Sequence, residues 1–322
     1  MSRRGRRENE FAPACTTVYV RGMVHVEFWE DPAALLGRAG DFLARDGLLN
    51  TVVNSVTNRA VAEDRAGVAP DPDAPRWWMT AIDDSDEVVG VAMRTATGAP
   101  YPLYVLRMPD RAARALARAL HERGEGVTAI NGALPSTRVC AEELARIEGG
   151  EVVESQRTRL FELGELVPPP RRPTGSLRPA APGDADLCLA WFLAFLADAD
   201  EQADRPRGSS PEISTFSKAD MLRRIADGVI WLWDEVDGTP VHLTGANPPS
   251  FGVSRIGPVY TPPELRGRGY ASAAVAEVSR LIREAGSRVC LFTDQANPTS
   301  NRIYQALGYE PVADLVNLTI RR

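Results

Sequence analysis

The chain has 322 residues, of which 44% are hydrophobic and 25% are charged. This balance is typical of a globular protein and argues against a disordered or fibrous chain. At about 100–200 residues per domain, the length predicts two domains. The formal net charge of −6 argues against nucleic acid or an anionic membrane surface as a partner, and it favours a cationic or neutral acceptor.

The cysteines and the hydropathy pattern exclude two further classes. The cysteines lie far apart without a Cys-x-x-Cys pair, and there are only three histidines, so we expect no metal site and reduced, buried thiols. No apolar run approaches the roughly 18 residues of a membrane-spanning helix, so we expect a cytoplasmic protein without a membrane partner. The four cysteines are Cys15, Cys140, Cys188 and Cys290.

Two irregular segments divide the chain. Residues 1–22 are rich in arginine and lack the apolar core of a signal peptide, which predicts a disordered arm or an over-extended start. Residues 167–175 contain four prolines, and proline favours an extended linker. The predicted domains are therefore residues 23–166 and 176–322.

The elements predicted for the first domain alternate between strand and helix, as in an α/β fold with a mixed sheet. In chain order they are strands at 77–82, 88–94 and 103–108, a helix at 110–122, a strand at 127–130 and a helix at 137–148.

The second domain repeats this order, which indicates an internal duplication. A helix at 184–198 and a loop at 199–217 precede the repeated part. Asp237-Gly238 predicts a hairpin turn because these residues tolerate a positive φ. In chain order we expect a helix at 218–226, strands at 229–235, 240–245 and 254–261, a helix at 271–284, a strand at 289–293 and a helix at 299–307.

Residues 266–271, Arg-Gly-Arg-Gly-Tyr-Ala, connect a predicted strand to a predicted helix. Backbone N–H groups at a helix N-terminus attract anions, and glycine lets a phosphate approach the backbone. We therefore expect Arg266, Gly267, Arg268 and Gly269 to form a phosphate site. The first domain has Arg-Met-Pro-Asp-Arg-Ala at residues 107–112, without glycine, which predicts a structural role or a wall of the acceptor pocket.

Two other phosphate-binding motifs fit poorly. A P-loop needs Gly-Lys-Ser/Thr, and the only lysine, Lys218, lies elsewhere. A dinucleotide fold needs a third glycine, where this chain has Ser272, and it places the turn after the first strand of a βαβ unit rather than after a hairpin.

The turn resembles the pyrophosphate motif of the GNAT acetyltransferase superfamily, Gln/Arg-x-x-Gly-x-Gly/Ala, at Arg266, Gly269 and Ala271. A second match, with Asn297, Asn301 and Tyr304 in residues 293–311, resembles the family's fifth strand and following helix. The resemblance covers residues 176–322 well and residues 24–165 as a worn copy. It implies two tandem GNAT-like domains, each a mostly antiparallel mixed sheet that opens between its fourth and fifth strands.

The resemblance also implies an acyl-CoA co-substrate, usually acetyl-CoA. Its pantetheine arm would pair with Val259 to Thr261, and Asn297 and Asn301 match positions that contact this arm or fix the loop. The expected cofactor-binding residues are Val259, Tyr260, Thr261, Arg266, Gly267, Arg268, Gly269, Tyr270, Ala271, Ser272, Asn297, Asn301 and Tyr304.

Tyr304 matches the family's frequent general acid, and a phenol can protonate a thiolate leaving group. The alternative for Tyr304 is an aromatic packed on a helix face. Asp294 and His242 are candidate bases, although Asp294 could only cap a turn and His242 could be a core histidine. Asp198, Asp200, Glu201 and Asp204 are either a solvated loop or a site for a cationic amine.

After Tyr309 about thirteen residues remain, enough for one long strand, whereas the resembling family usually ends in two. We therefore predict that the domains share a strand, with residues 152–163 as the candidate. The predicted function is direct transfer of an acyl group to a small-molecule or peptide amine. The alternative is a non-catalytic acyl-CoA-binding module, and the oligomeric state stays open between monomer and homodimer.

Overall fold

The computed structural model describes residues 15–18, 24–95, 101–203, 205–210 and 212–322. The N-terminal half alternates strands and helices as predicted and adds two helices, α1 and α2, before the first predicted strand. Its elements are β1 (Cys15–Val18), β2 (Val24–Trp29), α1 (Pro32–Arg45), α2 (Thr51–Arg65), β3 (Trp77–Asp83), β4 (Val88–Arg94), β5 (Leu103–Val105), α3 (Asp110–Glu122), β6 (Ala129–Ala133), α4 (Ser136–Glu148) and β7 (Glu151–Leu163).

In the C-terminal half, every predicted helix and strand is present within a few residues of its expected bounds. The elements are β8 (Ser176–Pro179), α5 (Ala185–Gln202), α6 (Glu212–Thr215), α7 (Lys218–Ala226), β9 (Ile230–Asp234), β10 (Pro240–Ala246), β11 (Val253–Tyr260), α8 (Tyr270–Glu284), β12 (Arg288–Asp294), α9 (Pro298–Ala306) and β13 (Tyr309–Arg321), with short 3-10 turns at Pro182–Asp184 and Pro263–Leu265.

Three predictions need correction. Residues 15–18, expected in a disordered arm, form β1 antiparallel to β2, because consecutive β-branched residues favour a strand; the other residues of 1–22 lie outside the described part. The predicted loop at 199–217 contains the end of α5 and the helix α6. The predicted strand at 103–108 ends at Val105, before Pro109 at the start of α3.

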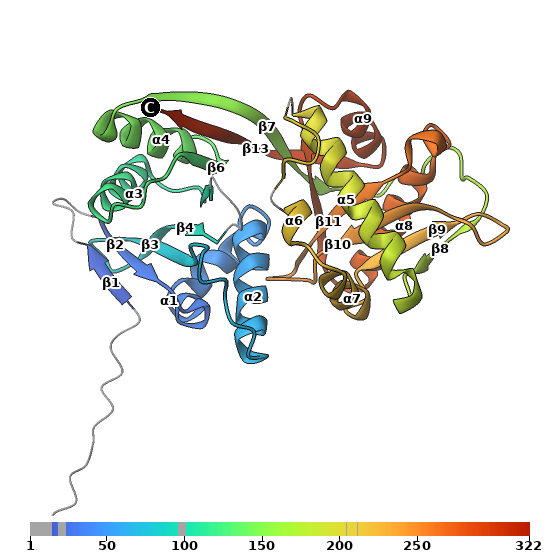
Figure 1. Cartoon of the computed structure of the whole chain (residues 1–322), viewed down its shortest axis with the longest axis horizontal. Coiled ribbons are helices and arrows are strands. Elements are labelled where there is room, and N and C mark those ends of the chain that lie inside the picture. The colour runs from blue at the N-terminus through green and yellow to red at the C-terminus, as the bar shows by residue number, and fades with distance from the viewer. Residues whose placement is uncertain (1–14, 19–23, 96–100, 204, 211) are drawn as a thin grey trace, which may run out of the picture.

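Across the described residues, thirteen strands form one sheet in the order β1-β2-β3-β4-β5-β6-β13-β7-β12-β11-β10-β9-β8. The halves exchange their last strands. Strand β7 pairs with β12 of the C-terminal half, and β13 pairs with β6 of the N-terminal half. Figure 1 shows β7 and β13 running side by side between the halves, with the C-terminus beside α4. This confirms the predicted shared strand and extends it to a reciprocal exchange.

Each half contains one parallel strand pair, and the two pairs end differently. Strands β11 and β12 pair only from Val253 to Ile256, so the rest of β11 separates from the end of β12. In the N-terminal half, β5 and β6 pair up to Val105 and Gly132. A Cβ on Gly132 would lie 2.0 Å from the Val105 carbonyl oxygen, so the two strands approach too closely for a ligand to enter between them.

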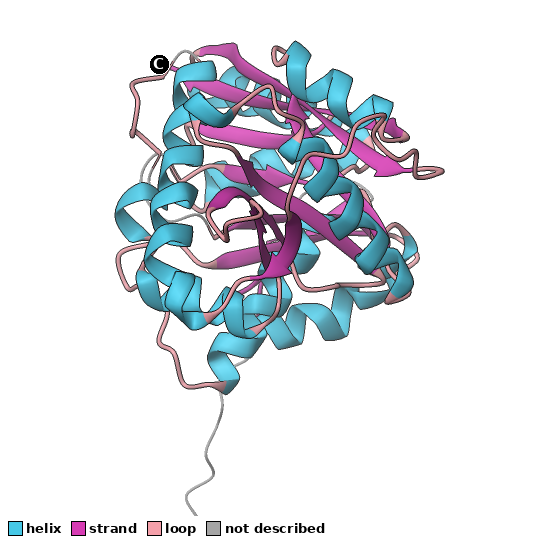
Figure 2. Ribbon diagram, turned by 90° about the vertical axis from the view of Figure 1, so that its right-hand side faces the viewer, coloured by secondary structure: helices cyan, strands magenta, loops and turns pink. Residues whose placement is uncertain are grey.

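Helices cover both faces of the sheet (Figure 2). In the N-terminal half, α3 and α4 pack on one face, whereas α1 and α2 pack against Trp78 on the other. In the C-terminal half, α8 packs on one face of β11 and β12, and α5 and α7 pack against β9 and β10. A small core at the centre of the sheet joins the halves; it includes Leu48, Leu160, Val253, Cys290 and Leu315.

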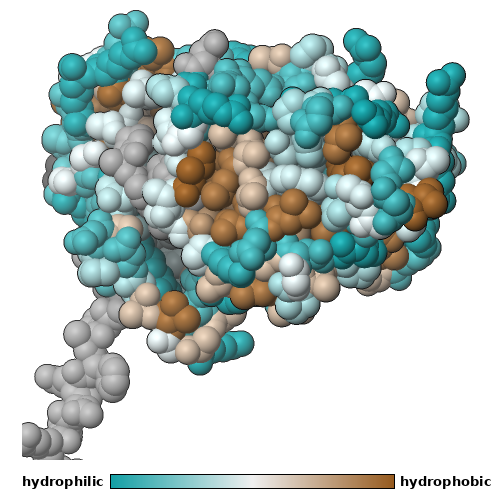
Figure 3. Space-filling view, turned by 45° about the vertical axis from the view of Figure 1, so that its right-hand side comes forward, coloured by the Kyte–Doolittle hydropathy of each residue, from teal (hydrophilic) through white to brown (hydrophobic). Residues whose placement is uncertain are grey.

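The face seen in Figure 3 carries short apolar groups separated by hydrophilic side chains rather than a continuous apolar band. Among the described helices, none combines the length and the hydropathy needed to cross a bilayer. Cys140, Cys188 and Cys290 are buried free thiols, as predicted.

Candidate active site

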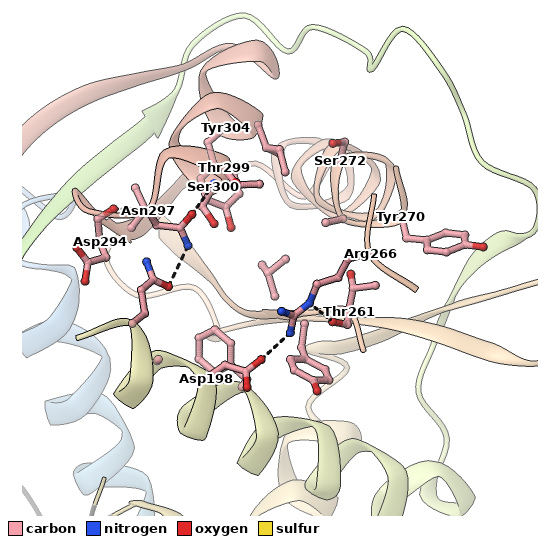
Figure 4. A pocket seen from close by; sticks show the side chains of 18 of the residues that line it. Asp198, Thr261, Arg266, Tyr270, Ser272, Asp294, Asn297, Thr299, Ser300 and Tyr304 are labelled. Carbon is pink, nitrogen blue, oxygen red and sulfur yellow. Dashed lines mark hydrogen bonds and ion pairs between the residues drawn. The ribbon is translucent and has the colours of Figure 1, made fainter. Parts of the chain in front are cut away.

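A cavity of about 710 Å³ lies where β11 and β12 separate. It is bounded by the end of β11, the turn after it, the first turn of α8, the end of β12, the first turns of α9 and one side of α5. Twelve of the thirteen predicted cofactor-binding residues line it, as do the candidate catalytic residues Asp294 and Tyr304 (Figure 4).

The turn before α8 has the geometry of an anion site. Gly267 and Gly269 have φ values of 78° and 90°, in the left-handed region that favours glycine. Gly269 is the N-cap of α8 and provides no side-chain cap. The first backbone N–H groups of the helix therefore lack partners within the helix and carry its positive partial charge. A Cβ on either glycine would meet no atom within 4 Å, so the space in front of the turn is open.

The arginines of the turn are held differently. Nη2 of Arg266 donates to Oδ2 of Asp198 at 2.6 Å, and its Nε donates to the Thr261 carbonyl oxygen at 2.9 Å. Arg268 is exposed; it donates a long hydrogen bond, 3.3 Å, to the Glu264 carbonyl oxygen and also interacts with the hydroxyl of Tyr270. To bind an anion, Arg266 would have to leave the Asp198 carboxylate, whereas the contacts of Arg268 are to a carbonyl and a hydroxyl.

Helix α5 forms one wall of the cavity and contacts both the α8 side and the α9 side. On the α8 side, Asp198 binds Arg266. On the α9 side, Asn297 donates from Nδ2 to Oε1 of Gln202 at 3.0 Å, and both contacts are drawn in Figure 4. The helix therefore connects the turn before α8 to the loop after β12.

The two predicted asparagines shape the loop that leads to α9. Asn297 is the N-cap of α9, where its Oδ1 accepts from the Ser300 backbone N–H at 2.9 Å. Asn301 lies outside the cavity lining, and its Nδ2 donates to the Asp294 and Asn297 carbonyl oxygens at 3.0 and 2.7 Å. Of its two predicted roles, contact with the cofactor arm or fixing of the loop, the structure shows the second.

Tyr304 lies on α9 and lines the cavity. Its ring packs edge-on against Tyr309, with 6.0 Å between the ring centres, and the residue is 8% exposed. Burial raises the pKa of its phenol to about 12. The hydroxyl is therefore protonated near neutral pH and can donate a hydrogen bond or a proton there.

Asp294, at the end of β12, is held by two donors. Its Oδ1 accepts from the Ala296 backbone N–H at 2.8 Å, and its Oδ2 accepts from Nε2 of Gln156 at 2.7 Å. Gln156 also lines the cavity, although it belongs to β7 of the N-terminal half. No sequence motif marks Gln156, because only the strand exchange brings it here.

The structure argues against His242 as the general base, because it lies outside the cavity lining. The residue is fully buried, and its ring nitrogens pair with the hydroxyls of Thr261 and Thr244 at 2.7 and 2.8 Å. Burial lowers its pKa to about 3, so the ring stays neutral. His242 is the core histidine of the alternative interpretation.

The acidic residues near the end of α5 are paired rather than open to a cationic amine. Arg207 donates to Asp198 and Glu201, each at 2.7 Å, and the buried Asp200 is bound by Arg205 and Ser210. Asp204 lies outside the described residues. Within the described part of the chain, no cluster of side chains could hold a metal ion.

The corresponding turn of the N-terminal half is filled by protein. The hydroxyl of Ser136, on α4, accepts from the Met108 backbone N–H and donates to the Met108 carbonyl oxygen, both at 2.9 Å. Together with the close approach of Gly132 to Val105, this leaves no open strand end beside α3.

Comparisons with known proteins agree with this fold. Residues 249–316 match the family model described as FR47-like protein, and no curated protein sequence matches. A GCN5-related N-acetyltransferase from Sphaerobacter thermophilus is similar in structure, with a TM-score of 0.55 and 20% identity over 76% of this chain and 81% of that one.

Two further solved structures are similar over nearly the whole chain. A tandem GNAT protein from the clavulanic acid biosynthesis pathway has a TM-score of 0.54 and 15% identity over 92% of this chain and 98% of its own. A Drosophila protein has a TM-score of 0.59 and 13% identity, with 97% and 99% covered. At these identities the similarity concerns the fold.

Proposed function

We propose that this chain, which has the tandem fold of the GNAT superfamily, is an acyl-CoA-dependent N-acyltransferase that transfers the acyl group directly to an amine. One observation carries the proposal. The uncapped start of α8, the separated ends of β11 and β12 and the protonated phenol of Tyr304 all border one cavity.

The residues present fit an acyl-CoA. Its pyrophosphate would bind the backbone N–H groups from Gly267 to Ser272, with Arg268 as the exposed cation. Residues Val259 to Thr261 of the separated end of β11 have no β12 partner opposite them, so their backbone can pair with the pantetheine amides. The bound acyl-CoA would supply a thioester that an amine can attack.

The chain's own groups would handle the protons. The phenol of Tyr304 would donate a proton to the departing sulfur, because burial keeps it protonated. The carboxylate of Asp294, oriented by Gln156, would accept a proton from the amine directly or through water. Among the described residues, no cysteine lines the cavity, which favours direct transfer over a covalent enzyme intermediate.

The test separates binding from chemistry. Acetyl-CoA binding and the release of free CoA would be measured with amines, amino acids, polyamines and peptides as acceptors. Arg268→Glu combined with Gly269→Glu should abolish binding by placing negative charge in the phosphate site. Tyr304→Phe should lower turnover by about 10²-fold or more with binding nearly unchanged.

A matched control is Tyr309→Phe. The hydroxyl of Tyr309 lies 2.7 Å from the hydroxyl of Ser279, and Tyr309 does not line the cavity. This variant should retain turnover. Acetyl-CoA binding without turnover on any acceptor would instead support a non-catalytic acyl-CoA-binding module, and unchanged turnover in Tyr304→Phe would remove this residue from the mechanism.

A further inference from the structure

Two arginines lie on the side of β11 that faces the N-terminal half. Arg255 lies on β11 two residues after Val253, and alternation along a strand places both on one face. Val253 packs there with Leu48 and Tyr104 of the N-terminal half. Arg224, on α7, donates to the Ala246 and Gly257 carbonyl oxygens at 2.9 and 3.3 Å, next to the same strand.

Neither arginine is neutralised. Within the described part of the chain, neither forms an ion pair with a carboxylate, whereas Arg159, Arg178 and Arg205 each do. Nη1 of Arg255 and Nε of Arg224 are enclosed without an acceptor. The other two nitrogens of the Arg255 guanidinium, Nε and Nη2, donate to the side-chain oxygen of Asn247. Both arginines are partly exposed, but the two nitrogen atoms without an acceptor are enclosed, so the side chains around them would have to move for a ligand to reach them.

The surroundings destabilise these positive charges. Burial lowers the pKa of Arg224 to about 10, and repulsion from Arg255 and Arg59 contributes. Burial also lowers the pKa of Arg255. The enclosed hydroxyl of Tyr104 also lacks a partner, and its electrostatic interaction with Arg255 places it nearby.

Such an arrangement is costly unless an anion completes it. An enclosed guanidinium N–H without an acceptor loses its hydration without compensation, and two neighbouring cations repel each other. Planar guanidinium groups are well suited to carboxylates, which they bind with charge-assisted hydrogen bonds.

The arginine pair is connected to the cavity through Phe292. The guanidinium carbon of Arg255 lies 5.7 Å from the centre of the Phe292 ring, and Phe292 lines the cavity. A bulge in β11 lies between Arg255 and the cavity residue Val259, and Val259 packs on the α8 face of the sheet. An extended acceptor would therefore reach the arginines past the Phe292 ring and not along β11.

We propose that Arg224 and Arg255 bind a carboxylate of the acceptor, so that the acceptor is an acid whose amine lies at the far end of an extended chain. This rests on the proposed function and names the substrate class. It revises the expectation of a cationic or neutral acceptor, because the acidic residues of α5 are already paired and the free charge beside the cavity is positive.

The test uses product analogues and requires no turnover. Short N-acetylated glycine peptides of increasing length, each as the free acid and as the carboxamide, would be titrated calorimetrically into the CoA-bound full chain. The acids should bind about tenfold more tightly than the amides, the magnitude of a charged hydrogen bond. Arg255→Met and Arg224→Met should each abolish this preference.

Arg280→Met, which changes an exposed arginine on α8 paired with Glu284, should retain the preference. Neither arginine has a carboxylate partner among the described residues, so replacing either by an apolar side chain of similar length leaves no carboxylate unpaired and should not unfold the protein. The two separate variants guard against a local effect. Equal affinity of acids and amides, or binding of neither, would overturn the proposal. Competition by inorganic phosphate alone would assign the site to phosphate and overturn it as well.

Turnover then separates the two proposals. Release of CoA with acids and amides alike would leave the acyltransferase proposal standing and reject the carboxylate site. Preferred binding of acids without any turnover would support the carboxylate site and reject the acyltransferase proposal.

Discussion

Gln156 of β7 donates a hydrogen bond of 2.7 Å from Nε2 to Oδ2 of Asp294 on β12. Its Oε1 accepts from Nδ2 of Asn317 on β13 at 2.8 Å. The two exchanged strands thus meet at one side chain of the cavity. The N-terminal half therefore contributes to the candidate active site directly.

We predict that Gln156→Leu lowers kcat about 3- to 10-fold, as expected for the loss of one orienting hydrogen bond, while acetyl-CoA binding is retained. Steady-state kinetics would measure the change. The neighbouring substitution Ser155→Ala removes only a hydrogen bond to the Asn317 carbonyl oxygen and serves as the control. Unchanged kcat in Gln156→Leu would show that Asp294 needs no such support or takes no part.

The carboxylate of Asp198 pairs with Arg266, at the end of the cavity where we propose that the pyrophosphate binds. Asp198→Asn should tighten CoA binding by several-fold, because it frees Arg266 and removes a repulsive charge, and the gain should shrink as salt is added. Calorimetric titration at two ionic strengths would measure it. Asp186→Asn, on the same helix but paired with Lys218, should have no effect, and weaker binding in Asp198→Asn would indicate that the ion pair positions Arg266.

Burial raises the pKa of Tyr304 to about 12. The phenol should therefore stay protonated through the range near pH 10 in which an ordinary tyrosine ionises. We expect the ratio of kcat between the wild type and Tyr304→Phe to remain constant from neutral pH to about pH 10. A ratio that falls through that range would mean that the phenol titrates normally and is not shielded in the enzyme.

The buried neutral ring of His242 predicts a loss of stability in acid. Its pKa is about 3 in the folded state, below that of an unfolded histidine, so the unfolded chain binds more protons between these values. The stability is complete above the unfolded pKa near 6.5 and falls as the pH drops, by up to about 1.4 kcal/mol per pH unit.

Denaturant unfolding from pH 7 down to acid would measure this slope. His242→Gln can keep hydrogen bonds to the threonines without titrating, so its slope should be shallower. The control is the same substitution at the exposed His121, which pairs with Glu148; His121→Gln should leave the slope closer to that of the wild type. Equal slopes in the wild type and His242→Gln would show that other groups cause the acid sensitivity.

Local patterns in the sequence predicted the parts of the cavity that lie close together along the chain. Residues 266–271 contain both glycines with a positive φ and the uncapped start of the helix. The cap formed by Asn297 involves only residues 297–300. Tyr304 follows on the same helix. Backbone conformation and helix capping depend on neighbouring residues, so these elements could be predicted without tertiary contacts.

The sequence by itself determined the alternation of elements, the phosphate turn and the shortage of strands after Tyr309. Only the tertiary structure decided that Gln156 reaches Asp294, that Asp198 pairs with Arg266 and that His242 is enclosed. It also decided that Arg224 and Arg255 lie between the halves without a carboxylate partner among the described residues. The physical reason is that burial and ion pairing depend on which distant segments pack together. No local pattern carries that information.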